Sequence, residues 1–191
     1  LHDEILPTLQ TATMLLKTDP DSAVAQLSDA HRQIANLLHD MPTTSVPEVA
    51  RLGLVEALKR SVEWSFAQAF DEVVWKIESD SAEKARQIPT LTAEVVFYAA
   101  REAVRNAAKY GRGPTNSFVL TVLIDWRDGL FLVVEDNGVG ISAEVQGNGH
   151  GLALHSTMMA VVGGTLTTDS RPNEFTRVTL SLNPQSTNAV P

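Results

Sequence analysis

The sequence contains no cysteine, which excludes disulfide bonds and thiolate metal sites and is compatible with a reducing compartment. It also has no apolar run of about 18 residues, as a membrane-spanning helix would need, and no signal peptide. Basic residues are fewer than acidic ones, 15 against 23, so the formal net charge is −8. This balance argues against a direct nucleic-acid partner and against an anionic membrane surface. There are no internal repeats.

What is present suits one or two soluble globular domains, with 191 residues of which 43% are hydrophobic and 20% charged. The chain begins at Leu1 without an initiator methionine. We therefore expect a cytoplasmic fragment of a longer protein, attached to a membrane only through missing upstream segments, if at all.

The first part, residues 1–41, is predicted to be a helical hairpin. Apolar residues recur at steps of three and four on either side of the turn at 19–22, which has Asp-Pro-Asp-Ser chemistry. Two such helices cannot bury both apolar stripes alone, so a second copy would complete a four-helix bundle. Residues 42–48 are a predicted linker, 49–183 a second domain, and 184–191 a tail.

The second domain is predicted to be an α+β sandwich, a mixed sheet with helices on one face, because its strands arrive in hairpins and its helices run together. A polar connection is expected at 79–89. The remaining elements are predicted helices at 49–66, 94–110 and 152–162, and predicted strands at 72–77, 118–126, 130–134, 165–170 and 176–182.

Glycines surround one acidic residue at the end of a predicted buried strand. Asp136 follows the apolar run 130–134, and Gly138 and Gly140 come directly after it. Alternate glycines through 147–151 then lead into a helix, whose free N–H groups suit a phosphate. A carboxylate for a purine amino group and a cradle for phosphates together describe a nucleotide site. The alternative is two Gly-rich turns around a hairpin; P-loop and Rossmann spacings are both absent.

The helix 94–110 places polar side chains on one face. Glu102, Asn106 and Lys109 (or Tyr110) lie at i, i+4 and i+7. An amide oxygen can hold Mg²⁺, a lysine can hold a phosphate, and a glutamate can take a proton or a water. The alternative is a solvated face with an incidental Glu–Lys pair.

These motifs together resemble the nucleotide-binding domain of histidine kinases, whose fold is shared with Hsp90, gyrase and MutL ATPases. Residues 102–109 look like the N box, 136–140 like the G1 box and 147–152 like the G2 box. The opening Leu-His-Asp-Glu and its hairpin resemble the dimerisation and phosphoacceptor domain of the His-Asp subclass.

The resemblance implies an ATP site that uses Mg²⁺. It implies that Asp136 accepts a hydrogen bond from the adenine amino group, while Gly138 and Gly140 let the base approach. Asn106 would hold Mg²⁺ and Lys109 a phosphate. The lid over the triphosphate would be framed by Gly149, Gly151 and Leu152. Thr176 would lie near the adenine and the phosphates. Tyr110 stands where the N box of the family commonly has a histidine.

The implied phosphoacceptor is His2, whose neutral imidazole attacks the γ-phosphorus while Asp3 orients the ring and accepts its proton. The triplet Leu-His-Asp recurs at 38–40. We favour His2 over His39 because a long helical stripe follows His2, whereas His39 adjoins the linker.

The implied function is that of a homodimeric sensor histidine kinase fragment, which phosphorylates its own histidine from ATP and transfers the phosphoryl group to a response-regulator aspartate. In this subclass the regulator usually carries a helix-turn-helix output. Pro7 stands where the subclass commonly has a glutamine implicated in phosphatase activity. The alternatives are an ATP-binding pseudokinase scaffold and an Hsp90- or gyrase-like ATPase without phosphotransfer.

Overall fold

The computed structural model describes residues 48–113, 117–141 and 150–183 of the chain. All of them belong to one unit that begins at Glu48. The predicted helical hairpin 1–41, most of the predicted linker and the predicted tail lie outside the described residues.

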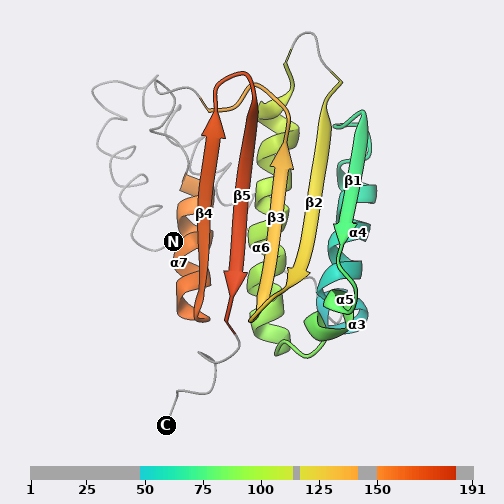
Figure 1. Ribbon diagram of the computed structural model, residues 1–191, viewed down its shortest axis with the longest axis vertical. Helices are drawn as coiled ribbons and strands as arrows, with labels where there is room; N and C mark the ends of the chain where they lie inside the picture. Colours follow the sequence, from blue (N-terminus) through green and yellow to red (C-terminus); the bar gives the residue numbers. More distant parts are fainter. Residues whose placement is uncertain (1–47, 114–116, 142–149, 184–191) are drawn as a thin grey trace, which may run out of the picture. The chain divides into compact units, whose positions relative to one another are not determined.

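Five strands form one mixed sheet in the order β1-β2-β3-β5-β4 (Figure 1). β1 is parallel to β2, and the other neighbouring pairs are antiparallel. The strands are β1 (Glu72–Ile77), β2 (Val119–Trp126), β3 (Leu130–Asp136), β4 (Gly164–Arg171) and β5 (Phe175–Leu182).

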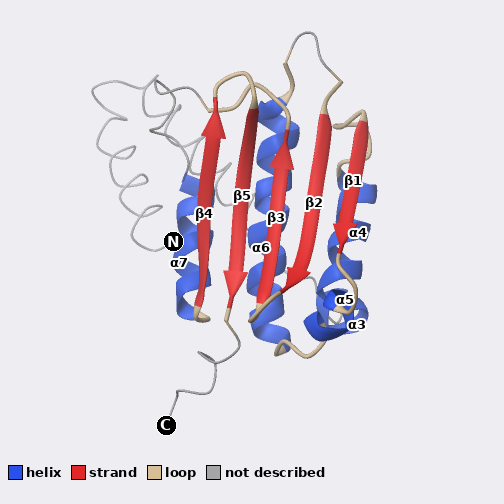
Figure 2. Ribbon diagram, viewed as in Figure 1, coloured by secondary structure: helices blue, strands red, loops and turns tan. Residues whose placement is uncertain are grey.

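Helices cover one face of this sheet, and the other face is open within the described part of the chain (Figure 2). The helices are α3 (Glu48–Leu52), α4 (Leu54–Ser65), α5 (Ser81–Ala85), α6 (Thr90–Asn106) and α7 (His150–Val161), and α6 continues into a π-helical turn, η1 (Ala107–Gly111). The predicted architecture of a mixed sheet with helices on one face is confirmed. Among the described helices, none is long and apolar enough to span a membrane.

The core lies between the sheet and the helices, and period-two alternation along the strands builds it. In β3, Leu130, Leu132 and Val134 are buried while the residues between them are half-buried. The same alternation carries Asp136 onto the helix-facing side at the end of the strand, where it is 4% exposed. The alternation along β3 therefore places a carboxylate at the edge of the core.

One predicted helix and one predicted connection were wrong in detail. The predicted helix 49–66 is interrupted at Gly53, whose positive φ of 79° separates α3 from α4. An L-residue rarely adopts this backbone conformation, so the glycine permits the break. The predicted polar connection at 79–89 contains α5, whose Ser81 and Ala85 are buried.

The central helix also differs from its prediction of 94–110. It begins earlier, at Thr90 directly after Pro89, and its α-helical part ends at Asn106. The next five residues form the wider π turn. Such turns interrupt α-helices mostly as single turns and are frequent at functional sites. The strands agree with their predicted ranges to within two residues.

Candidate functional site

The candidate site centres on the buried carboxylate of Asp136. Within the described residues its one hydrogen-bond donor is the amide of Gly138, 3.0 Å from Oδ1. The pKa of Asp136 is raised from 3.8 to about 6, chiefly because the carboxyl group is buried; the Gly138 hydrogen bond lowers it and the charge of Glu135 raises it, and both effects are included in that value. A carboxylate offers about four acceptor positions, so this one keeps capacity for another donor.

Thr176 lies beside Asp136 on the neighbouring strand, because the two residues are paired in the register of β3 and β5. Directly opposed residues of antiparallel strands project to the same face, so both side chains point toward the helix layer. The hydroxyl of Thr176 is 3.3 Å from that of Ser170 on β4. The structure thus brings together two predicted site residues that are 40 positions apart in the sequence.

Gly138 lies directly against the end of the π turn. A Cβ atom at Gly138 would be 2.0 Å from the carbonyl oxygen of Gly111, and one at Gly111 would be 3.0 Å from Asp136 Oδ1. The amide of Val139 donates to that same Gly111 carbonyl at 2.8 Å. The loop after β3 and the end of the central helix are therefore in direct backbone contact, and only glycine fits at Gly138.

Gly140 fixes the other side of this loop. Its φ is +65°, and a Cβ atom there would be 2.2 Å from the carbonyl oxygen of Arg171, at the end of β4. The amide of Asn173 donates to the carbonyl of Val139 at 2.8 Å, which ties the loop to the β4–β5 turn. The loop 137–141 is thus held between α6 and the β4–β5 hairpin, as a preformed binding loop requires.

Glu102 is buried on α6 and meets the start of α7. Its Oε2 pairs with Arg105 at 2.7 Å, and a Cβ atom at Gly151 would be 2.3 Å from its Oε1. Leu152 is half-buried against the core. The acid therefore pairs with Arg105, one turn along the helix, and not with Lys109.

Asn106, Lys109 and Tyr110 do not share one regular α-helical face, because the π turn begins directly after Asn106. Asn106 is half-buried, whereas Lys109 and Tyr110 are exposed. The Lys109 ammonium lies 4.9 Å from the centre of the Tyr110 ring. This wider turn places the cation at the solvent side of the site.

His2, Asp3 and Gly149 lie outside the described residues. Several described residues that contribute to the candidate site were not predicted from the sequence. One is Gly111, which lies directly against Asp136. Another is Arg105, whose i+3 spacing from Glu102 could have indicated an ion pair on the helix.

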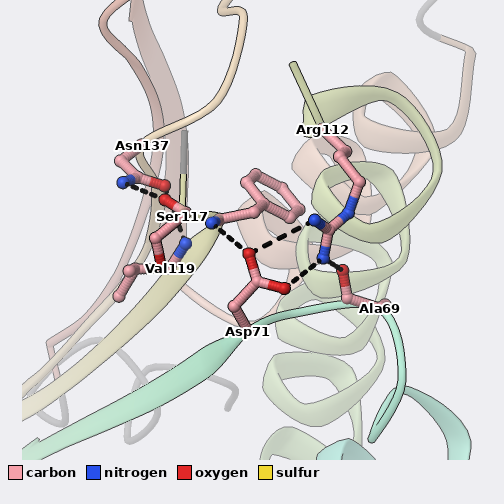
Figure 3. A network of polar contacts seen from close by, with 7 residues as sticks. Ala69, Asp71, Arg112, Ser117, Val119 and Asn137 are labelled. Atoms are coloured by element: carbon pink, nitrogen blue, oxygen red, sulfur yellow. Dashed lines mark hydrogen bonds and ion pairs between the residues drawn. The ribbon is translucent and has the colours of Figure 1, made fainter. Parts of the chain in front are cut away.

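A polar network near the start of β2 was missed as well (Figure 3). There Arg112 and Asp71 form an ion pair, and the side chain of Asn137 accepts from the amide of Val119 at 2.7 Å. The partners are 41 and 18 residues apart, so no local spacing indicated them.

The chemistry of the side chains suits a nucleotide with a magnesium ion. No group of three acidic or histidine side chains that could hold a metal by itself occurs among the described residues. Mg²⁺ at nucleotide sites typically takes one or two protein oxygens together with phosphates and waters. The half-buried amide of Asn106 can supply such an oxygen, and Lys109 can supply a positive charge for phosphate.

Comparison with known proteins adds a family assignment. Residues 93–186 match the family described as "Histidine kinase-, DNA gyrase B-, and HSP90-like ATPase". No curated protein matches the sequence significantly.

Two solved structures have a similar fold. One is the histidine kinase domain from the Erythrobacter litoralis EL346 blue-light activated histidine kinase, with 16% identity and a TM-score of 0.58 over 77% of this chain and 67% of that one. The second is the Erythrobacter litoralis EL346 blue-light activated histidine kinase, with 16% identity and a TM-score of 0.59 over 98% of this chain. The present chain covers 62% of that second chain. At this identity the likeness shows the fold, which is that of a histidine kinase catalytic domain.

Proposed function

We propose that the chain is the catalytic part of a sensor histidine kinase, because residues 93–186 match the histidine kinase-, DNA gyrase B- and HSP90-like ATPase family. In this proposal the described domain binds ATP with Mg²⁺. A histidine of the same polypeptide then receives the γ-phosphoryl group and passes it to an aspartate of a response regulator.

The observation that carries the ATP assignment is the incomplete hydrogen bonding of Asp136. This carboxylate is 4% exposed but has one donor, the Gly138 amide, among the described residues. A buried charge with so few partners is costly unless a ligand completes its shell. The exocyclic amino group of adenine is a suitable donor for this carboxylate.

The other residues follow from their places around Asp136. Asn106 would hold Mg²⁺, which shields phosphate charge when bound. Lys109 would contact a phosphate and Thr176 would contact the nucleotide beside Asp136. Glu102 lies against Gly151, so we propose that it orients a proton or water where α7 begins, with Gly149 and Leu152 at the lid and Tyr110 at its exposed rim.

His2 is the proposed phosphoacceptor. A neutral imidazole nitrogen attacks the γ-phosphorus, the bond from phosphorus to the bridging oxygen breaks, and ADP leaves with the electron pair. Asp3 takes the proton from the other ring nitrogen. His39 is the rival acceptor, with Asp40 beside it.

The apolar stripes of 1–41 support a homodimer, because burying them against a second copy contributes about 25 cal/mol per Å². Static light scattering at micromolar concentration tests this, and a monomer would count against it. The regulator partner, with a helix-turn-helix output in this subclass, rests on the resemblance of the first forty residues.

Incubation with γ-labelled ATP separates the proposed kinase from its rivals. Acid-labile, base-stable label on the protein supports a histidine kinase. Released phosphate without protein label supports an Hsp90- or gyrase-like ATPase. Saturable ATP binding with neither product supports a pseudokinase scaffold, and the Asp136→Asn variant is the matched control for site-dependent label.

A further inference from the structure

We propose that Arg112 and Asp71 act as a clamp that positions the adenine end of the nucleotide site. The inference rests on the proposed function, but the clamp itself is a contact between three segments of the described chain. Arg112 directly follows Gly111, the residue that contacts both Asp136 and Gly138. The position of Arg112 therefore constrains the backbone of Gly111 beside Asp136.

The clamp is multidentate (Figure 3). The two terminal nitrogens of Arg112 donate to the two carboxylate oxygens of Asp71 at 3.2 and 3.0 Å. One of these nitrogens also donates to the carbonyl of Ala69 at 3.0 Å. Arg112 thus joins the end of the π turn to the connection between α4 and β1.

Asp71 also binds the start of β2. Its Oδ2 accepts the amide of Phe118 at 2.6 Å, and its own amide donates to the Phe118 carbonyl at 2.8 Å. The Arg112 hydrogen bonds, and then the Phe118 amide, hold the pKa of Asp71 below its usual 3.8. The Arg112 guanidinium lies 5.3 Å from the centre of the Phe118 ring.

This ring completes the path to the site. Phe118 is 2% exposed, and a Cβ atom at Gly111 would be 2.6 Å from its Cζ. Phe118 therefore restrains Gly111 by packing against it, and Arg112 restrains it as its neighbour in the chain. If the clamp opens, one of the restraints that keep Gly111 against Asp136 and Gly138 is lost.

The exposure of both side chains indicates that the ion pair does not mainly serve to stabilise the domain. Arg112 and Asp71 are 46% and 44% exposed, and exposed ion pairs contribute little to stability. A positioning role predicts a larger effect on the site than on global unfolding.

The chain offers a matched control at the opposite end of β2. Arg127 pairs with Asp125 at 2.7 Å, is itself 68% exposed, and lies 4.7 Å from the centre of the Phe131 ring. Like Arg112, it pairs with an aspartate and lies near a phenylalanine ring, but neither of these partners is a predicted site residue. Arg127→Gln therefore measures the loss of an exposed Arg–Asp pair stacked on a phenylalanine.

The experiment compares Arg112→Gln, Arg112→Lys and Asp71→Asn with Arg127→Gln in the full chain. The first readout is hydrogen exchange of the Val139 amide, which donates to Gly111 and needs no nucleotide. We expect its protection to fall in Arg112→Gln and Asp71→Asn, partly in Arg112→Lys, and not in Arg127→Gln. Unchanged Val139 protection in a folded Arg112→Gln protein would overturn the clamp.

The second readout is calorimetric affinity for ATP and adenosine. Arg112→Gln is expected to weaken both by about fivefold to tenfold, or about 1–1.4 kcal/mol, because the clamp acts on the adenine end. The double variant with Asp71→Asn should lose little more than either single variant. Affinities within twofold of wild type, or equal losses in Arg127→Gln, would refute the positioning role. If the wild-type chain binds no ATP, the proposed function fails, and Val139 exchange still decides whether the clamp exists.

Discussion

Replacing Asp136 by asparagine should weaken ATP binding and at the same time stabilise the nucleotide-free domain. The stabilisation follows from the raised pKa, from 3.8 to about 6, which means that the folded domain disfavours the charged carboxylate. The unfolded chain releases this proton near pH 3.8, whereas the folded domain keeps it until about pH 6. Stability is therefore lost as the pH rises through this window, and the loss is complete above it.

The size of the effect follows from the same values. The difference of 6 − 3.8 = 2.2 pH units corresponds to about 3 kcal/mol at about 1.36 kcal/mol per unit, as an order of magnitude. Asparagine keeps an oxygen for the Gly138 amide and carries no charge. We expect Asp136→Asn to gain about 1–3 kcal/mol of unfolding free energy at pH 7.5, and little or nothing at pH 4.

The binding loss has a separate cause. If the asparagine oxygen stays on the Gly138 amide, its NH₂ group faces the adenine amino group, and two donors then oppose each other. Losing a hydrogen bond to a charged acceptor should weaken ATP by roughly 1.5–3 kcal/mol. Isothermal titration calorimetry measures this loss.

Urea unfolding between pH 4 and pH 8 measures the stability change. All three tryptophans, at positions 64, 75 and 126, lie in the described domain, so their fluorescence reports its unfolding. Glu72→Gln is the control, because Glu72 is an exposed acid of the same sheet, on β1, and its charge is not among the causes of the Asp136 pKa shift. An Asp136→Asn protein that is less stable than wild type at pH 7.5, or that binds ATP with unchanged affinity, would refute the reasoning.

Three further predictions concern the remaining parts of the site. Asn106→Asp and Lys109→Ala should reduce ATP-dependent phosphorylation much more than calorimetric affinity for adenosine; equal losses would mean that these residues only shape the site. Gly138→Ala would place its methyl group 2.0 Å from a backbone carbonyl oxygen, so we expect a cost of at least about 1–3 kcal/mol in urea unfolding together with loss of ATP binding, and wild-type behaviour would contradict the packing. His2→Gln should abolish acid-labile label from γ-labelled ATP and His39→Gln should leave most of it, and the reverse pattern would identify the other histidine.

The sequence pattern predicted the sheet and the place of Asp136 at the end of a buried strand because both depend on local order. Alternation along 130–134 determines which face of β3 is buried, and continuing it by two residues gives the position of Asp136. Glycine spacing indicated where the backbone approaches closely. These signals are contained in a few consecutive residues.

Other features depend on contacts that the sequence does not display. The break at Gly53 interrupts a helical pattern that continues on both sides, and a glycine within such a pattern does not by itself indicate a positive φ. The π turn after Asn106 has no recognised sequence signal, yet it moves Lys109 off the predicted face. The Arg112–Asp71 pair joins residues 41 positions apart, so only the fold shows it.

The comparison of ATP with GTP binding to the wild-type chain tests the central claim most directly. Adenine presents an amino group to the Asp136 carboxylate, whereas guanine presents a carbonyl oxygen at the same ring position. Because a buried carboxylate facing a carbonyl leaves both acceptors unpaired, GTP should bind at least about tenfold more weakly, or about 1.4 kcal/mol. Calorimetry at pH 7.5 should show saturable ATP binding and little or no GTP binding. Equal affinities for the two nucleotides, or no ATP binding, would contradict an adenine site built on Asp136.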